Sequence, residues 1–213
     1  YYPEAFVNMI ALLGWNPGTE QEIFSMDELI EAFSLERVGK SGSRFDPEKA
    51  KWFNHQYLQK RKNSQLAMEF REFLREKGFH YDIVRLEMLV AMVKERVDFA
   101  KEFWSQTDFF FRAPEAYDQE AVKKRWKENT AVILGELKEV LKGINDFSAQ
   151  TTETTVKSWI ESREYNMGAV MNPFRLVIVG ALRGPHMFDI ISWIGKDETI
   201  ARIEKGLLLI GRK

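Results

Sequence analysis

The chain has 213 residues, of which 45% are hydrophobic and 30% charged, with a formal net charge of −1 and no cysteine. This composition is ordinary for a globular protein, and it excludes a disulfide framework and a cysteine-based zinc site. No apolar run approaches the ~18 residues of a membrane-spanning helix, and the lack of cysteine fits a reducing compartment, so we expect a cytoplasmic protein. The first residues, YYPEAF, lack the features of a signal peptide and indicate a chain cut from a longer protein.

Positive charge is concentrated in one stretch of the chain. Seven basic residues lie between Lys40 and Lys62, opposed within that stretch only by Asp46 and Glu48. A local basic stripe on a nearly neutral protein suits a phosphate backbone, although a solvated helix face accounts for the same composition.

The first helix is predicted from Pro3 to Gly14. Proline suits the first helical turn, where its missing N–H costs nothing, and glycine suits the end. Five apolar residues fall on one face of this helix at helical spacing: Ala5, Phe6, Met9, Ile10 and Leu13.

Two further start signals follow. Ser25 and Glu28 form a capping box for the next helix. Its predicted buried set is Leu29, Ile30 and Phe33. Asp46, followed by a proline at the first turn, opens a third helix, on which Lys49 and Lys60 can point away from the apolar side.

The middle of the chain continues the helical pattern. Asn63 or Ser64 caps a helix that ends at Gly78, and Asp82 opens another whose apolar side includes Val84 and runs to Val97. The aromatic run 109–111, followed by a proline, is predicted to be a connector that tucks its rings under neighbouring helices. One long helix is predicted from Asp118 to Leu141.

The last third is also predicted to be helical. A helix covers Ser148 to Tyr165, and two short amphipathic helices flank Gly195. The β-branched run 174–182, FRLVIVGAL, would pass for a strand, but we expect a helix because a lone strand cannot satisfy its backbone hydrogen bonds. The fold class is therefore all-α, with boundaries near 70 and 146 at turn signals.

No catalytic or metal site assembles in the pattern. His55, His80 and His186 lie far apart and lack the spacing of metal ligands. The GKSGSR stretch at 39–44 lacks the second Gly-Lys pair of a phosphate-binding loop and follows a helix. We expect no metal ligands and no catalysis by this chain alone.

Three ordered blocks resemble bacterial glutamyl-tRNA synthetases, which are class I aminoacyl-tRNA synthetases. The strongest covers residues 3–58, with ALLGW, EIFS, FDPEKAKWFN and HQYL. The second is KERVDFAKEFW at 94–104, and the third is NPFRLVIVGALRGPHMFDIISWIGKDETIARI at 172–203. The stretch 105–165 matches mainly in its helical pattern.

The resemblance implies the region of the enzyme that recognises tRNA. It implies a stem-contact helical domain over 1–70, followed by an anticodon-binding region of two helical subdomains, 71–146 and 147–213. The family's His-Ile-Gly-His-type and Lys-Met-Ser-Lys-type motifs are absent from the chain. No cofactor is therefore expected here, whereas the full enzyme uses ATP and Mg²⁺ to attach glutamate to tRNA. The implied partner is tRNA(Glu), not DNA or a membrane, and the protein is expected to be a monomer.

Residues can be transferred by motif. Arg96 matches the arginine that reads the last anticodon base, since a guanidinium can pair with base acceptors in an unstacked loop. The alternative is a helix-surface arginine beside Asp98. A second set matches the stretch that cradles the first two anticodon bases: Arg175, Gly184, Pro185 and Met187. The alternative there is a core Pro-Gly turn with a buried methionine.

The basic stripe receives a role in the same way. Four of its residues lie where the stem-contact domain meets the inner arm of the tRNA: Lys40, Arg44, Lys49 and Lys51. They would contact phosphates, which position the RNA without specifying its sequence.

One alternative function and one question of specificity stay open. A helical protein-interaction module without RNA binding could use the six Trp and sixteen Phe as a docking surface. Bacterial glutaminyl enzymes read the anticodon with β-barrels, so the helical pattern argues against that family. Whether the full enzyme also charges glutamine tRNA is left open.

Overall fold

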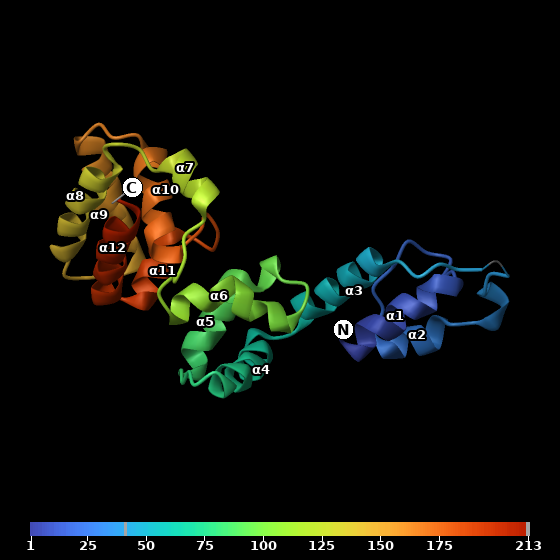
Figure 1. The fold of residues 1–213 in the computed structure, drawn as a ribbon. Coiled ribbons are helices and arrows are strands. Elements are labelled where there is room, and N and C mark those ends of the chain that lie inside the picture. Colours follow the sequence, from blue (N-terminus) through green and yellow to red (C-terminus); the bar gives the residue numbers. More distant parts are fainter. Residues whose placement is uncertain (41, 212–213) are drawn as a thin grey trace. The chain divides into compact units, whose positions relative to one another are not determined.

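The computed structural model describes residues 1–40 and 42–211, and over these ranges the fold is all-α, as predicted (Figure 1). No β-strand forms in the described ranges, where Trp15 and Val38 make an isolated antiparallel bridge. Ser41, which belongs to the GKSGSR stretch, lies outside the described residues.

Twelve α-helices follow one another in the described ranges: α1 (Pro3–Gly14), α2 (Met26–Ala32), α3 (Pro47–Lys60), α4 (Asn63–Glu76), α5 (Ile83–Val93), α6 (Phe103–Phe111), α7 (Gln119–Arg125), α8 (Thr130–Lys142), α9 (Ala149–Ser162), α10 (Met167–Val179), α11 (Met187–Ile194) and α12 (Lys196–Ile210). Three short 3-10 turns are η1 (Leu35–Arg37), η2 (Lys94–Arg96) and η3 (Ala100–Glu102).

The chain divides into two compact units, Tyr1–Gln106 and Thr107–Lys213. In the first, α1 packs against α3 and α4 against α5; in the second, α10 packs against α7, α8 and α12. The predicted division into three domains, with boundaries near 70 and 146, differs from this division and stays a prediction.

The caps predicted for the first unit are confirmed. Ser25 N–H donates to Glu28 Oε2 at 2.6 Å and Glu28 N–H donates to Ser25 Oγ at 3.2 Å, which completes the capping box. Asp46 Oδ1 accepts from the N–H groups of Glu48 and Lys49 at 2.9 and 3.3 Å and so starts α3. These signals act within one turn of the chain, which is why the sequence shows them.

Burial was predicted less well for the first two helices. Leu29 is buried beside Trp15 and Phe24, as the pattern indicated. Ile30 and Phe33 are exposed instead, although they were predicted to be buried. Ile30 lies about 100° around the helix from Leu29 and therefore faces away from the core. Phe33 is the C-cap of α2, and although it is exposed, its ring centroid lies 5.6 Å from that of Trp15.

The helix predicted to carry apolar residues as far as Val97 ends earlier. The α-helix α5 stops at Val93 and the 3-10 turn η2 follows, so Arg96 lies on a turn and not on a helix flank. Val84, predicted on the apolar side, is exposed. Side chains from α3 hold the backbone after Val93, and tertiary contacts of this kind override a local helical pattern.

The aromatic run 109–111 was predicted to be a connector between helices, and this prediction is wrong. Residues 109–111 form the end of α6, and Phe109 and Phe110 are buried, so only the packing of the rings was correct. The single helix predicted from Asp118 to Leu141 is broken into α7 and α8. Thr130 Oγ1 accepts from the Lys127 N–H at 2.8 Å, which gives that N–H a partner outside a continuous helix.

Residues 174–179 of the ambiguous β-branched run are helical, as predicted, and form the second half of α10, whereas 180–182 lie beyond its end. Gly206 of α12 packs directly on this helix, because a Cβ at Gly206 would overlap Val177 Cγ1. The close approach lets the two helices bury their β-branched side chains against each other. The predicted break at Gly195 separates α11 from α12, as expected.

Candidate nucleic-acid interface

The side chain of Arg175 holds the backbone of the turn between α10 and α11. Its Nη1 donates to the carbonyl oxygens of Arg183 and Pro185, each at 2.9 Å. One guanidinium nitrogen therefore joins two carbonyls on either side of Gly184. A cation that bridges two acceptors in one turn fixes the path of the chain more firmly than a neutral hydrogen bond would.

Gly184 is required at this place for two reasons. Its φ is +100°, a backbone conformation that residues with a Cβ rarely adopt, and a Cβ there would lie 2.9 Å from Phe109 Cζ. The turn thus lies directly against the Phe109 side chain at Gly184. The predicted Pro-Gly turn is present, with its backbone set by Arg175 and its floor by an aromatic side chain.

Two of the predicted base-contacting residues face inward. Pro185 and Met187 are buried, the latter with 2% of its surface exposed. The side chains that the turn presents to solvent are Leu182, Arg183 and His186. Sequence reasoning did not select these three. The signal that could have identified them is their position immediately around the Gly-Pro pair, where the buried residues alternate with exposed ones.

Arg183 is held in place without being buried. Its Nη2 lies 2.8 Å from Asp108 Oδ1, and its guanidinium carbon lies 5.2 Å from the centroid of the Phe109 ring. About two fifths of the side-chain surface remains exposed. The guanidinium is therefore oriented by a carboxylate and an aromatic face, while one side of it stays in water.

His186 lies at an acidic edge of the same turn. Its Nε2 is 3.5 Å from Glu153 Oε1 and its Nδ1 is 3.9 Å from Asp189 Oδ2. The hydrogen bond from Lys157 and, to a smaller extent, the charge of His186 lower the pKa of Glu153, so this carboxylate is ionised at neutral pH. The negative charges here balance the arginines and limit indiscriminate attraction of anions.

A buried arginine ties the base of the turn to two helices. Arg202 of α12 has 2% of its surface exposed, and its Nη1 donates to the carbonyls of Phe109 at 2.6 Å and Ile178 at 3.0 Å. Its Nε lies 2.6 Å from Glu198 Oε1, which compensates the buried charge. Arg202 thereby joins the end of α6, against which the turn packs at Phe109, to the end of α10, which leads into the turn.

Arg96 is presented by a turn that α3 holds in place. Three side chains of α3 contact the carbonyls around it: Gln59 Nε2 lies 2.8 Å from the Lys94 oxygen, His55 Nδ1 2.9 Å from the Val97 oxygen, and Asn54 Nδ2 2.5 Å from the Asp98 oxygen. Arg96 itself is exposed. It projects from a backbone fixed on both sides, which suits a residue that must meet a base in a set geometry.

Lys94, in the same turn, points the other way. Its Nζ donates to the Arg61 carbonyl at 2.6 Å, and burial lowers its pKa. It therefore fastens η2 to the end of α3, while Arg96 faces solvent.

The basic stripe carries more opposing charge than its own sequence indicated. Lys49 Nζ lies 2.8 Å from Glu22 Oε1, and Lys51 Nζ lies 3.8 Å from Glu48 Oε2 and 4.0 Å from Asp98 Oδ2. Glu22 and Asp98 lie outside residues 40–62, so the composition of that stretch does not show them. Lys51 also brings the stripe next to the turn of Arg96.

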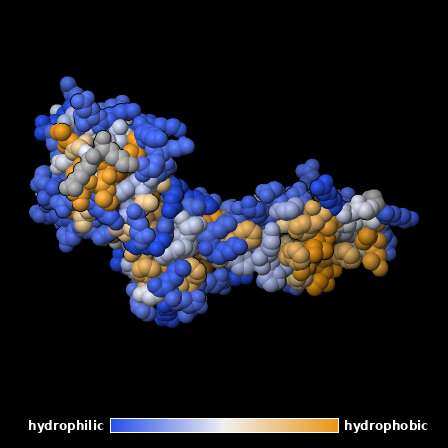
Figure 2. Space-filling model, in the orientation of Figure 1, coloured by the Kyte–Doolittle hydropathy of each residue, from blue (hydrophilic) through white to orange (hydrophobic). Residues whose placement is uncertain are grey.

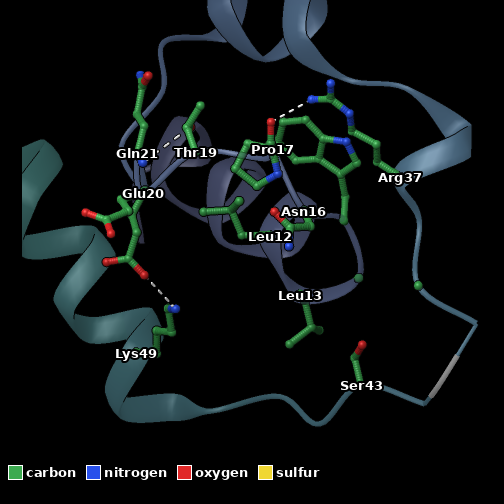
Figure 3. Close-up of a pocket in the computed structure, with 14 residues that line it drawn as sticks. Leu12, Leu13, Asn16, Pro17, Thr19, Glu20, Gln21, Arg37, Ser43 and Lys49 are labelled. Atoms are coloured by element: carbon green, nitrogen blue, oxygen red, sulfur yellow. Dashed lines mark hydrogen bonds and ion pairs between the residues drawn. The ribbon is translucent and has the colours of Figure 1, made fainter.

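Lys40 and Arg44 lie exposed on the loop that leads to α3. A hollow of about 540 Å³ adjoins this loop. Arg37 and Lys49 enter it from opposite sides (Figure 3). Arg37 Nη1 donates to the Pro17 carbonyl at 2.6 Å, which holds the guanidinium at the rim. Two cationic side chains thus border the hollow together with the carboxylates of Glu20 and Glu22, the latter paired with Lys49.

The arrangement presents exposed basic side chains on turns whose backbone is held by hydrogen bonds. No group of three or more metal-ligating side chains occurs among residues 1–40 and 42–211. Over the same stretches of the chain, none of the helices combines the length and apolarity needed to span a bilayer. The structure brings Arg175, Gly184, Pro185 and Met187 together in the second unit, whereas Arg96 and the basic stripe belong to the first.

Comparisons with known proteins agree with this arrangement. The family described as "anticodon binding domain" matches residues 62–207, and the family described as "tRNA synthetases class I (E and Q), catalytic domain" matches residues 1–52. The chain is 53% identical over 207 residues to a glutamate–tRNA ligase of Flavobacterium johnsoniae, a match that covers 97% of this chain and 41% of the ligase. It is 50% identical over 211 residues to that of Porphyromonas gingivalis, covering 99% of this chain and 42% of that protein.

A solved structure shows the same fold. A glutamate tRNA ligase from Elizabethkingia meningosepticum superposes with a TM-score of 0.93 and 43% identity, over 99% of this chain and 42% of that one. The chain thus spans about two fifths of the length of the curated relatives that it matches. With the anticodon-binding family matched over most of its length, the chain belongs to the anticodon-binding domain family of the bacterial glutamate–tRNA ligases.

Proposed function

We propose that this chain binds tRNA(Glu) through the anticodon and the inner arm, as the tRNA-recognition region of a glutamate–tRNA ligase. The observation that carries the proposal is the turn between α10 and α11, held by Arg175 inside the region of the anticodon-binding family. Such a turn offers a fixed backbone and oriented polar groups, which suits the recognition of unstacked bases.

The predicted roles are refined by the contacts. Arg175 acts first as a positioning residue, since its Nη1 already donates to two carbonyls of the turn. Arg183 and His186, which are exposed, are the side chains that can reach a splayed base or its phosphate. Pro185 and Met187 would support the turn from below, and Gly184 lets its backbone lie close to Phe109.

Arg96 would read the last anticodon base from its own turn. Its guanidinium offers two parallel N–H groups, which pair with the acceptor atoms of a base edge. Lys40, Arg44, Lys49 and Lys51 would hold the phosphates of the inner arm. Lys49 and Lys51 would exchange Glu22, Glu48 and Asp98 for phosphate, and this exchange lowers the net gain from each contact.

The other properties follow from the same proposal. The chain would act as a monomer in the cytoplasm and would bind tRNA rather than DNA or a membrane. ATP and Mg²⁺ belong to the whole ligase, which would activate glutamate and transfer it to tRNA(Glu). This chain, without a nucleotide site among its own motifs, would be inactive alone. The proposed modules remain a stem-contact domain over residues 1–70 and two anticodon-binding subdomains over residues 71–146 and 147–213.

Ribose footprinting of tRNA(Glu) with the purified chain tests the proposal. We expect protection at the anticodon loop and along the inner arm, and no protection of the same tRNA by heat-denatured chain. Uniform protection of all nucleotides, or none, would contradict anticodon recognition. Glutamate-dependent exchange of pyrophosphate into ATP should be absent, and detectable exchange would contradict the proposed lack of catalysis.

A further inference from the structure

Helix α3 contacts two different parts of the first unit. Its apolar residues Ala50 and Phe53 pack on α1. Most of its other residues are polar, and Figure 2 shows mainly hydrophilic surface over α3, beside hydrophobic surface gathered over α1 and α2. Two of the polar side chains, Asn54 and Gln59, donate hydrogen bonds to backbone carbonyls in and just after η2. Helix α3 therefore joins α1 to the turn that carries Arg96.

The two carbonyls lie on either side of Arg96 in the sequence. Gln59 Nε2 donates to the Lys94 carbonyl at 2.8 Å, two residues before Arg96. Asn54 Nδ2 donates to the Asp98 carbonyl at 2.5 Å, two residues after it. Both donors are neutral amides, so they hold the backbone without placing a further charge beside the guanidinium. We call Asn54 and Gln59 the anchoring amides.

The start of α1 sets the orientation of the Asn54 amide. The Tyr2 N–H donates to Asn54 Oδ1 at 2.7 Å, so the NH₂ group of this amide faces the Asp98 carbonyl. An amide turned by 180° would place a donor against the Tyr2 N–H and an acceptor against the Asp98 oxygen. Only 1% of the surface of Asn54 is exposed, so water cannot replace either partner. One orientation alone satisfies both contacts.

The backbone after Arg96 is also held by a residue outside α3. Glu102 Oε2 accepts from the N–H groups of Asp98 and Phe99 at 2.8 and 3.2 Å. Both backbone groups of Asp98 therefore have side-chain partners, its N–H in Glu102 and its carbonyl in Asn54. Because the Lys94 carbonyl is held as well, Arg96 extends from a segment that is fixed before and after it.

A fixed backbone matters more for reading a base than for contacting a phosphate. A guanidinium that pairs with two acceptor atoms of a base edge must lie in the plane of the base, and such contacts need placement to within roughly 0.5 Å and 10–20°. A phosphate contact tolerates larger displacements, because charge attraction falls slowly with distance and several oxygens can accept. Loosening the turn would therefore reduce discrimination between bases before it reduced general affinity for RNA.

We infer that Asn54 and Gln59 are positioning residues for the reading of the last anticodon base by Arg96, and that the Tyr2 N–H orients Asn54 for this role. The inference rests on the proposed function, in which Arg96 reads that base. It adds that discrimination depends on side chains of α3 that act through the backbone of the turn and not through contact with RNA.

The test compares the dissociation constants of the chain for two full-length tRNA(Glu) transcripts that differ only in the last anticodon base. The measured quantity is the ratio of the two constants, which is expected to be roughly 5- to 100-fold in the unaltered chain. Gln59→Met keeps the length of the side chain but removes the donor to the Lys94 carbonyl. We expect the ratio to fall by about threefold or more, with a smaller change in affinity for the altered transcript.

Asn54→Asp separates the two contacts of the buried amide. The carboxylate can still accept from the Tyr2 N–H, but its second oxygen would face the Asp98 carbonyl and repel it. The ratio should fall at least as far as with Gln59→Met. Circular dichroism shows whether this variant folds, since a buried charge is costly. If it does not fold, the half-buried Gln59 position decides the question alone.

The matched control is Gln56→Met, at a half-buried position of the same helix. The hydrogen bonds to the two carbonyls come from Asn54 and Gln59, so this variant should keep the ratio of the unaltered chain. Without RNA, backbone amides in 94–98 should exchange hydrogen faster in Gln59→Met than in Gln56→Met.

The outcomes separate this inference from the proposed function. If Gln59→Met weakens both transcripts by the same factor, or weakens neither, the anchoring amides only stabilise the fold and the inference is overturned while the proposed function stands. Faster exchange with an unchanged ratio would overturn it in the same way. If the unaltered chain does not distinguish the two transcripts, the reading of the last base by Arg96 fails, and this inference fails with it.

Discussion

Arg175 Nη1 donates to the Pro185 carbonyl oxygen at 2.9 Å, and this contact decides how the predicted anticodon residues are to be understood. From the sequence, Arg175 and Pro185 are both predicted to face the RNA. In the structure, Arg175 holds the backbone on which Pro185 lies, while Pro185 itself is buried. The surface that remains for a base is formed by their exposed neighbours.

Replacing Arg175 by alanine should loosen this turn. The carbonyls of Arg183 and Pro185 would lose a charged donor, and hydrogen bonds of this type stabilise by about 1.5–3 kcal/mol. We expect urea unfolding to show a loss of about 2 kcal/mol together with faster hydrogen exchange in 181–187. Arg125→Ala, at an exposed position of α7, is the matched control and should change neither quantity. A stable Arg175→Ala variant with unchanged exchange would show that the turn does not depend on this side chain.

Gly184→Ala tests the shape of the same turn. A positive φ of +100° and a Cβ only 2.9 Å from Phe109 Cζ should together cost about 1–3 kcal/mol of unfolding free energy. Gly135→Ala is the control: it lies within α8, where an added Cβ meets nothing within 4 Å, and should stabilise by about 0.5–1 kcal/mol. Thermal unfolding of both variants measures the difference. Equal shifts of the same sign would contradict the strained, close-packed turn.

Arg96→Ala should remove base discrimination rather than general affinity. We expect roughly a 5- to 100-fold loss for the cognate anticodon loop, as for the loss of one bidentate base contact, and a much smaller loss for a loop with a changed last base. Lys40→Ala, at an exposed phosphate-contact position of the same unit, should weaken both loops equally. Titration of two labelled full-length tRNA(Glu) transcripts, which differ only in the last anticodon base, measures both. Equal losses for the two loops with Arg96→Ala would reduce Arg96 to a phosphate contact or a bystander.

Tyr57 predicts how stability changes at alkaline pH. Burial, with smaller effects of Glu4 and Glu28, raises its pKa to about 12 from 10.0. Its hydroxyl donates to the Phe24 carbonyl and lies 2.9 Å from Asn8 Oδ1. The unfolded chain therefore loses this proton first, so the contribution is complete below pH 10 and is lost as the pH rises from about 10 to about 12. Tyr57→Phe should make unfolding less steeply dependent on pH in that range. An identical pH dependence in both proteins would contradict the raised pKa.

The features of the fold that the sequence predicts are those set by neighbours in the chain. The Ser25–Glu28 capping box and the helix start at Asp46 each depend on contacts within one turn, and both are present. The β-branched run of α10 was predicted to be helical because the rest of the pattern offers no partner strand, and this prediction from backbone hydrogen bonding is confirmed.

The features that could not be predicted depend on contacts between distant segments. The turn of Arg96 is set by Asn54, His55 and Gln59, about 40 residues earlier, and no local pattern records those hydrogen bonds. Helical spacing marked Ile30 as apolar but could not show that it stays exposed in this unit. In the candidate site, the motif selects the turn between α10 and α11, but no local pattern shows that Met187 is buried there and Arg183 exposed.

The most direct test of the central claim is the affinity of the purified chain for tRNA(Glu) as a function of salt and anticodon. Four phosphate contacts by Lys40, Arg44, Lys49 and Lys51 predict a fall of roughly 50- to 150-fold between about 50 and 200 mM salt. A transcript with an altered anticodon should bind more weakly at every salt concentration, with the same slope. Binding that does not depend on salt, or that is equal for the two transcripts, would contradict recognition of tRNA(Glu) through its anticodon.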